Sequence, residues 1–142
     1  MTNPDLARDY LTRATARLKA VAVLMGEGAF ADVVRESQEV VELVLKAVLR
    51  HFGIAVPFSH EPSQSFIDNA SRLPADIQAS IPRWTEISRR LRRDRELAFY
   101  GSEDVTPSSF YTRDDAAEAK AMAEEIVADA TPALRDGPAG VS

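Results

Sequence analysis

The sequence VRESQEVVELVLKAVLRHFG, residues 34–53, decides the fold of this chain. Its apolar residues are too many for the single stripe of a surface helix, and Gly53 ends it. A helix that is apolar around most of its circumference lies at the centre of a bundle or in an interface. We expect this helix to span about residues 30–52. Valine has a low helix propensity, so tertiary burial must hold it. The apolar residues are Val33, Val34, Val40, Val41, Leu43, Val44, Leu45, Ala47, Val48 and Leu49.

The polar residues of this helix form a narrow line along one side. Glu42 and Lys46 stand four residues apart in the favourable order, and the simplest interpretation is an intrahelical ion pair of a few tenths of a kcal/mol. The residues on this one line are Arg35, Glu39, Glu42, Lys46 and Arg50.

Other helices surround this one in the sequence, and no segment has a convincing strand pattern. Pro82 is expected at the start of the long third helix, and Thr131-Pro132 is expected to weaken or end the last one. The pattern predicts an all-α, up-and-down bundle of four to five helices in one domain, residues 1–135, with a flexible tail, 136–142. The expected helices are about 4–25, 63–70, 75–80, 82–100 and 113–130, with a loop at 102–111.

The second informative stretch is SRRLRRDRELAFYG, Ser88 to Gly101. Residues 83–95 hold six arginines and two carboxylates, a net charge of +4 in a chain whose formal net charge is −5. Arg89, Arg90, Arg92 and Arg93 lie mostly off the apolar stripe of the expected helix. They form either a solvated face or a patch for nucleic acid or a protein partner.

Arg95 lies on the apolar stripe itself. Three- and four-residue steps place it in line with residues that are mostly apolar. A guanidinium on a core-facing stripe needs a carboxylate, a phosphate or a wet cleft. Two interpretations stay open: Arg95 pairs with Glu39 or Glu42 of the second helix, or it contacts a ligand phosphate. The other stripe residues are Ile77, Ile81, Trp84, Ser88, Leu91 and Ala98.

The composition excludes several classes of protein. There are no cysteines, so disulfides and thiolate metal sites are excluded, and two histidines leave little for a histidine-based metal centre. No apolar run resembles a signal peptide or approaches the roughly 20 residues of a membrane span. We therefore expect a cytoplasmic protein with no metal and no cofactor. The net acidity argues against broad nucleic-acid binding outside the arginine stretch.

Three pieces of the sequence resemble the HEPN family of small helical proteins. They are the second helix with its Glu42 and Lys46, the segment SHEPS at 59–63 with His60, and RELAFYG at 95–101 followed by an alanine-rich helix. The resemblance covers most of residues 5–130. It implies a four- or five-helix bundle and commonly a homodimer. Family members occur as metal-independent RNases, often toxins of toxin–antitoxin pairs, or beside a minimal nucleotidyltransferase.

The catalytic signature that the resemblance implies is an arginine, usually followed by Asn, Asp or His, with a histidine five to seven residues after the arginine. Arg95 matches the arginine, but Glu96 follows it and Tyr100 stands where the histidine is expected. RNA cleavage through the 2′-hydroxyl needs a base and an acid near neutral pH and a cation at the phosphorus. Arginine suits the last role, whereas a phenol is a poor base at pH 7.

The leading hypothesis is a HEPN-like module that binds RNA, a nucleotide or a protein partner without efficient catalysis. The first alternative is an endoribonuclease that uses Arg95 with Tyr100 or His60. The second is an accessory subunit of a minimal nucleotidyltransferase. A homodimer through the second and third helices is expected. The candidate catalytic residues are Arg95 and Tyr100, and the candidate ligand contacts are Glu39, Glu42, Lys46, Arg92 and Arg95.

Overall fold

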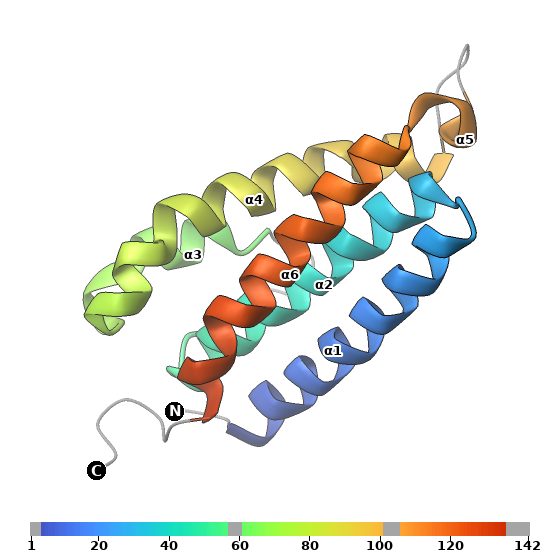
Figure 1. Cartoon of the computed structure of the whole chain (residues 1–142). Helices are drawn as coiled ribbons and strands as arrows, with labels where there is room; N and C mark the ends of the chain where they lie inside the picture. The colour runs from blue at the N-terminus through green and yellow to red at the C-terminus, as the bar shows by residue number, and fades with distance from the viewer. Residues whose placement is uncertain (1–3, 57–60, 101–105, 136–142) are drawn as a thin grey trace.

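Four long helices run side by side along the molecule (Figure 1). The computed structural model describes residues 4–56, 61–100 and 106–135, with the side chains of 94–100 left out. The expected all-α helical bundle is confirmed, and the expected tail lies outside the described residues. The long helices are α1 (Pro4–Gly26), α2 (Phe30–His51), α4 (Ala75–Tyr100) and α6 (Arg113–Arg135); the short ones are α3 (Ser63–Asp68), the 3₁₀ turn η1 (Ala70–Arg72) and α5 (Pro107–Phe110).

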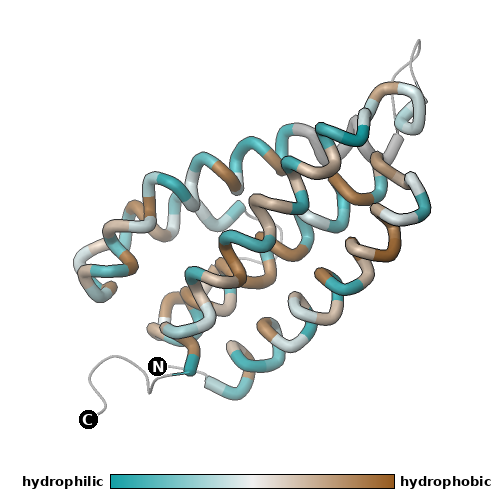
Figure 2. Tube along the Cα trace, in the orientation of Figure 1, coloured by the Kyte–Doolittle hydropathy of each residue, from teal (hydrophilic) through white to brown (hydrophobic). Residues whose placement is uncertain are grey.

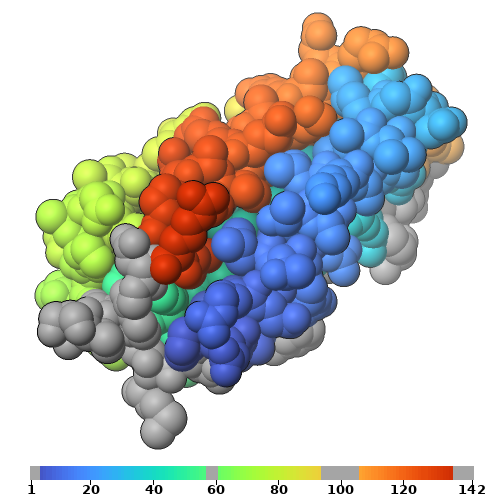
Figure 3. All heavy atoms as spheres, turned by 60° about the horizontal axis from the view of Figure 1, so that its bottom comes forward, coloured from blue at the N-terminus to red at the C-terminus, as the bar shows by residue number. Residues whose placement is uncertain are grey.

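Helix α2 is the centre of the bundle, as its sequence predicts. It packs against α1, α4 and α6, and Figure 3 shows α1 and α6 covering it on one face. Val40, Val44 and Leu45 have no exposed surface, and only Phe30 and Leu43 among its apolar residues are half-buried. The apolar residues of α2 are therefore used inside the chain itself. A homodimer through α2, which stays a prediction, would have to use the half-buried polar line.

Small residues let α1 and α6 lie close to α2. Ala7, Ala14 and Val21 of α1 recur every seven residues and have no exposed surface. On α6 the expected packing face is confirmed, because every member is buried: Ala116, Ala119, Met122, Ala123, Ile126 and Ala130. The hydropathy colouring in Figure 2 shows the same alternation of apolar and polar residues along each helix.

Glycines end the first two helices. Gly28 has a φ of 73° and lies in the turn between α1 and α2, where its N–H donates to the Met25 carbonyl at 3.1 Å. Gly53 has a φ of 78° directly after α2, and the Ile54 N–H donates back to the Leu49 carbonyl at 2.8 Å. Left-handed backbone of this kind favours glycine.

Two prolines that were expected to bound helices lie inside them, so both boundaries are wrong. Helix α4 runs unbroken from Ala75, with Pro82 in its interior. The apolar stripe is buried on both sides of this proline, with Ile77 at 3% exposure and Trp84 at 1%. This burial offsets the cost of the lost backbone hydrogen bond.

The last helix also continues beyond the proline at its expected end. Helix α6 continues past Pro132 to Arg135, and Leu134 beyond the proline is buried at 4% exposure. The expected loop at 102–111 contains the short helix α5, and the expected helix 63–70 ends earlier, at Asp68. The two helices expected at 75–80 and 82–100 are therefore one helix, and the helix expected at 113–130 extends to Arg135.

The central position of α2 can be tested by making the same valine-to-alanine substitution at a buried and at an exposed position. Val44→Ala removes two methyl groups from a side chain with no exposed surface, and we expect a loss of roughly 2–4 kcal/mol in the free energy of unfolding. Val23→Ala makes the same change on α1 at 64% exposure and should stay within about 0.5 kcal/mol. Chemical denaturation measures both. Equal losses at the two positions would contradict the packing.

Candidate functional site

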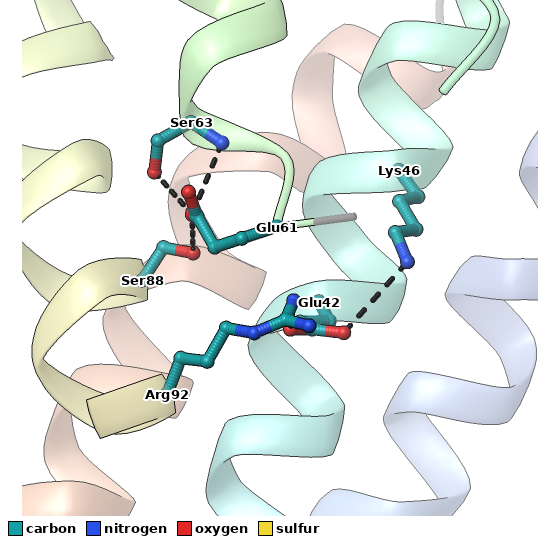
Figure 4. A network of polar contacts seen from close by, with 6 residues as sticks. All are labelled: Glu42, Lys46, Glu61, Ser63, Ser88 and Arg92. Atoms are coloured by element: carbon teal, nitrogen blue, oxygen red, sulfur yellow. Dashed lines mark hydrogen bonds and ion pairs between the residues drawn. The ribbon is translucent and has the colours of Figure 1, made fainter. Parts of the chain in front are cut away.

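A charged cluster joins α2 to α4 (Figure 4). We call Glu42, Lys46 and Arg92 the α2–α4 cluster. Arg92 Nη1 donates to Glu42 Oε1 at 2.6 Å, and Lys46 Nζ lies 3.7 Å from Glu42 Oε2. The expected Glu42–Lys46 ion pair is therefore confirmed. Of the predicted ligand contacts, these three come together, and Glu39 lies half-buried on α2 nearby in the sequence.

The carboxylate of Glu42 is the least exposed group of this cluster. Its side chain is 12% exposed, that of Lys46 14% and that of Arg92 31%. A carboxylate removed from water to this extent needs opposite charges within hydrogen-bonding distance. Arg92 supplies the short contact and Lys46 the longer one. The cluster therefore links α2 to α4 through charged hydrogen bonds and also forms a polar site.

Arg95 and Tyr100 belong to the last turns of α4. Their side chains lie outside the described residues, and so does His60. The proposed pairing of Arg95 with Glu39 or Glu42 and its alternative contact with a phosphate both stay predictions. Among the described residues Arg92, one turn earlier, is the arginine that meets Glu42.

A second polar network, which the sequence analysis missed, fastens the loop after α2 to α4. Glu61 Oε1 accepts hydrogen bonds from the Ser63 backbone N–H at 3.0 Å, from the Ser63 hydroxyl and from the Ser88 hydroxyl at 2.5 Å. Both serines are 1% exposed. Two signals could have found the network: a serine on the apolar stripe of α4 and a carboxylate two residues before the start of α3. Figure 4 shows this network close to the α2–α4 cluster.

Part of the arginine stretch pairs with carboxylates of α6 at the surface of the bundle. Arg83 forms two hydrogen bonds with Glu125 of α6, at 2.9 and 3.1 Å, and Arg90 lies 2.6 Å from Glu118 of α6. The hydrogen bond from Arg83 lowers the pKa of the Glu125 carboxyl, and Glu125 in turn raises the pKa of Arg83. These arginines hold α4 to α6.

Arg89 and Arg93, like Arg83, have exposed side chains on α4. The nearest partner of Arg89 is the Gln64 amide oxygen, at 3.5 Å, which is a weak contact. The exposed cations in the described part of α4 are therefore Arg83, Arg89 and Arg93.

His51 is no candidate for proton transfer. It ends α2 at 2% exposure, its ring packs edge-on against Phe52 at 4.9 Å, and its Nε2 has no hydrogen-bond partner within the described part of the chain. A base that acts on RNA must reach the substrate, and this ring is enclosed. The described residues also hold no group of three or more histidine, aspartate or glutamate side chains suited to a metal ion.

The comparisons identify a family. A family model described as HEPN domain matches residues 7–131, a range that contains all of α2 and α4 and nearly all of α1 and α6. No curated protein and no solved structure gives a significant match. Within the described residues no helix has both the length and the apolar character needed to cross a membrane.

The fastening role of the α2–α4 cluster can be tested by a double-mutant cycle. Arg92→Met leaves the Glu42 carboxylate with only its longer contact, and we expect a loss of about 1–3 kcal/mol in the free energy of unfolding. Glu42→Gln in the same chain should recover part of it, with a coupling of about 1–2 kcal/mol.

The control is Arg89→Met, which removes an exposed arginine from the same helix and should change stability by less than about 0.5 kcal/mol. A coupling near zero, or an equal loss in the control, would contradict the role given to Glu42.

Proposed function

The chain belongs to the HEPN domain family, and we propose that it acts by binding a phosphate-bearing ligand, RNA or a nucleotide, rather than by cutting RNA. The binding surface is the α2–α4 cluster together with Glu39, Arg89, Arg93 and Arg95. Arginine suits this role, because its guanidinium presents several donors that match the geometry of a phosphate.

The observation that carries this proposal is the missing histidine after Arg95 in the sequence. Tyr100 stands where the resemblance to catalytic members implies a histidine, and no histidine follows His60 in the chain. His51 is enclosed in the core at 2% exposure. A phenol, with an ordinary pKa near 10, takes up a proton poorly at neutral pH but donates a hydrogen bond or stacks on a base. This supports binding without efficient cleavage.

A second candidate function is that of an accessory subunit for a minimal nucleotidyltransferase. It is favoured by the way the arginines are used: Arg83, Arg90 and Arg92 all pair with carboxylates of neighbouring helices. In a chain of net charge −5, this leaves few cations for a polyanion and favours a protein partner. Co-purification with that enzyme, with no RNA binding at low salt, would support this alternative.

The proposal predicts how RNA binding depends on salt. In EDTA, with a labelled single-stranded RNA followed by fluorescence anisotropy, the wild type should bind and the recovered RNA should be intact. The double variant Arg89→Gln/Arg93→Gln should bind at least about tenfold more weakly at 50 mM salt. The slope of log affinity against log salt should fall by about 1.4, because each phosphate contact to a single strand contributes about 0.7.

The matched control is Arg13→Gln/Lys19→Gln, which removes two exposed cations from α1 and leaves the net charge the same as in the first variant. It should change affinity less than about twofold. An equal loss in both variants would mean that only the overall charge matters, and no binding by the wild type at 50 mM salt would refute the proposal.

A further inference from the structure

A small cavity lies between α1 and α2. It has a volume of about 70 Å³ and is lined by Tyr10 of α1, Lys46 and Arg50 of α2, and Val56 of the following loop. Among these lining residues are two cations and a phenol, and no carboxylate. The cavity therefore presents hydrogen-bond donors from two helices at one place.

Two of these donors have no partner within the described part of the chain. Neither the Tyr10 hydroxyl nor the Arg50 guanidinium forms a hydrogen bond or an ion pair there, and both side chains are half-buried. Half-buried polar groups of this kind are normally satisfied by a protein group, water or a ligand. The cavity has room for a ligand that accepts from both.

Both charged residues that line the cavity are cations. The carboxylate nearest to Lys46 in the α2–α4 cluster is Glu42, at 3.7 Å, and Arg92 already holds that carboxylate at 2.6 Å. Lys46 is only 14% exposed, so water screens its charge poorly. The lining of the cavity therefore includes the charges of Lys46 and Arg50, which favour an anion there.

We propose that this cavity binds a phosphate dianion, either inorganic phosphate or the terminal phosphate of a nucleotide or oligonucleotide. Its volume of about 70 Å³ exceeds what one water requires, roughly 10–15 Å³, but is far below the roughly 300 Å³ or more of pockets that enclose whole ligands. A compact tetrahedral group fits such a space. Arg50 and Lys46 supply the charge, and the Tyr10 hydroxyl donates a hydrogen bond.

This site goes beyond the function proposed above, because Tyr10 and Arg50 lie outside the surface proposed there and only Lys46 belongs to both. The probe is sodium phosphate, added at constant ionic strength and followed by amide chemical shifts in ¹H–¹⁵N spectra. The wild type should show saturable shifts centred on Tyr10 and Arg50. Arg50→Gln should weaken phosphate binding at least about tenfold and Tyr10→Phe about threefold or more.

The control variant is Lys19→Gln, which removes one exposed cation of α1 away from the cavity. It should change phosphate affinity by less than about twofold. The conservative Tyr10→Phe guards against a folding artefact, because it removes only a hydroxyl. Absence of saturable shifts in the wild type, or equal affinity in Arg50→Gln, would overturn the proposal.

Two further ligands distinguish the sources of the phosphate. If the terminal phosphate of RNA is bound, 5′-phosphorylated RNA should bind more tightly than the same RNA with a 5′-hydroxyl, and Arg50→Gln should abolish that difference. If inorganic phosphate alone is bound, the two RNAs should bind equally while phosphate still shifts the Tyr10 and Arg50 amides. If the cavity does not bind phosphate, RNA binding through Arg89 and Arg93 is unaffected, so each proposal can be refuted without the other.

Discussion

The enclosure of α2 by three other helices is the constraint on which the rest of the structure depends. A helix that is apolar on most of its circumference is unstable in water, and here α1, α4 and α6 cover it. The side that stays half-buried carries the charged line with Glu39, Lys46 and Arg50. The same packing that buries the valines therefore gathers the polar groups at one side, where the α2–α4 cluster and the small basic cavity lie.

The sequence was sufficient to predict the helices and the central position of α2, because hydrophobic periodicity is a local property. It was insufficient to predict that two helices continue past Pro82 and Pro132. A proline inside a helix costs about 3 kcal/mol or more by local rules, so Pro82 and Pro132 were expected at helix ends. Burial on both sides of them outweighs that cost, as Trp84 and Leu134 show. Such burial is a tertiary effect that a single sequence does not display.

The residues of the candidate site were predictable from the sequence, but which of them pair with one another was not. The sequence indicated that Glu42 and Lys46 pair within α2, and it left open whether Arg95 pairs with Glu39 or Glu42 or contacts a phosphate. It does not give the axial offset of α4 against α2, and the structure brings Arg92 to Glu42 at 2.6 Å. Glu61 was missed for a related reason, since its partner Ser88 is 27 residues away in the chain.

This protein is a HEPN domain in which Arg83, Arg90 and Arg92 pair with carboxylates of neighbouring helices. We propose that it binds RNA or a nucleotide without efficient cleavage. The most direct test is incubation of the purified protein with a mixed RNA pool in EDTA, followed on a denaturing gel. The account predicts that the wild type leaves the RNA intact. Cleavage by the wild type that Arg95→Ala abolishes would contradict it.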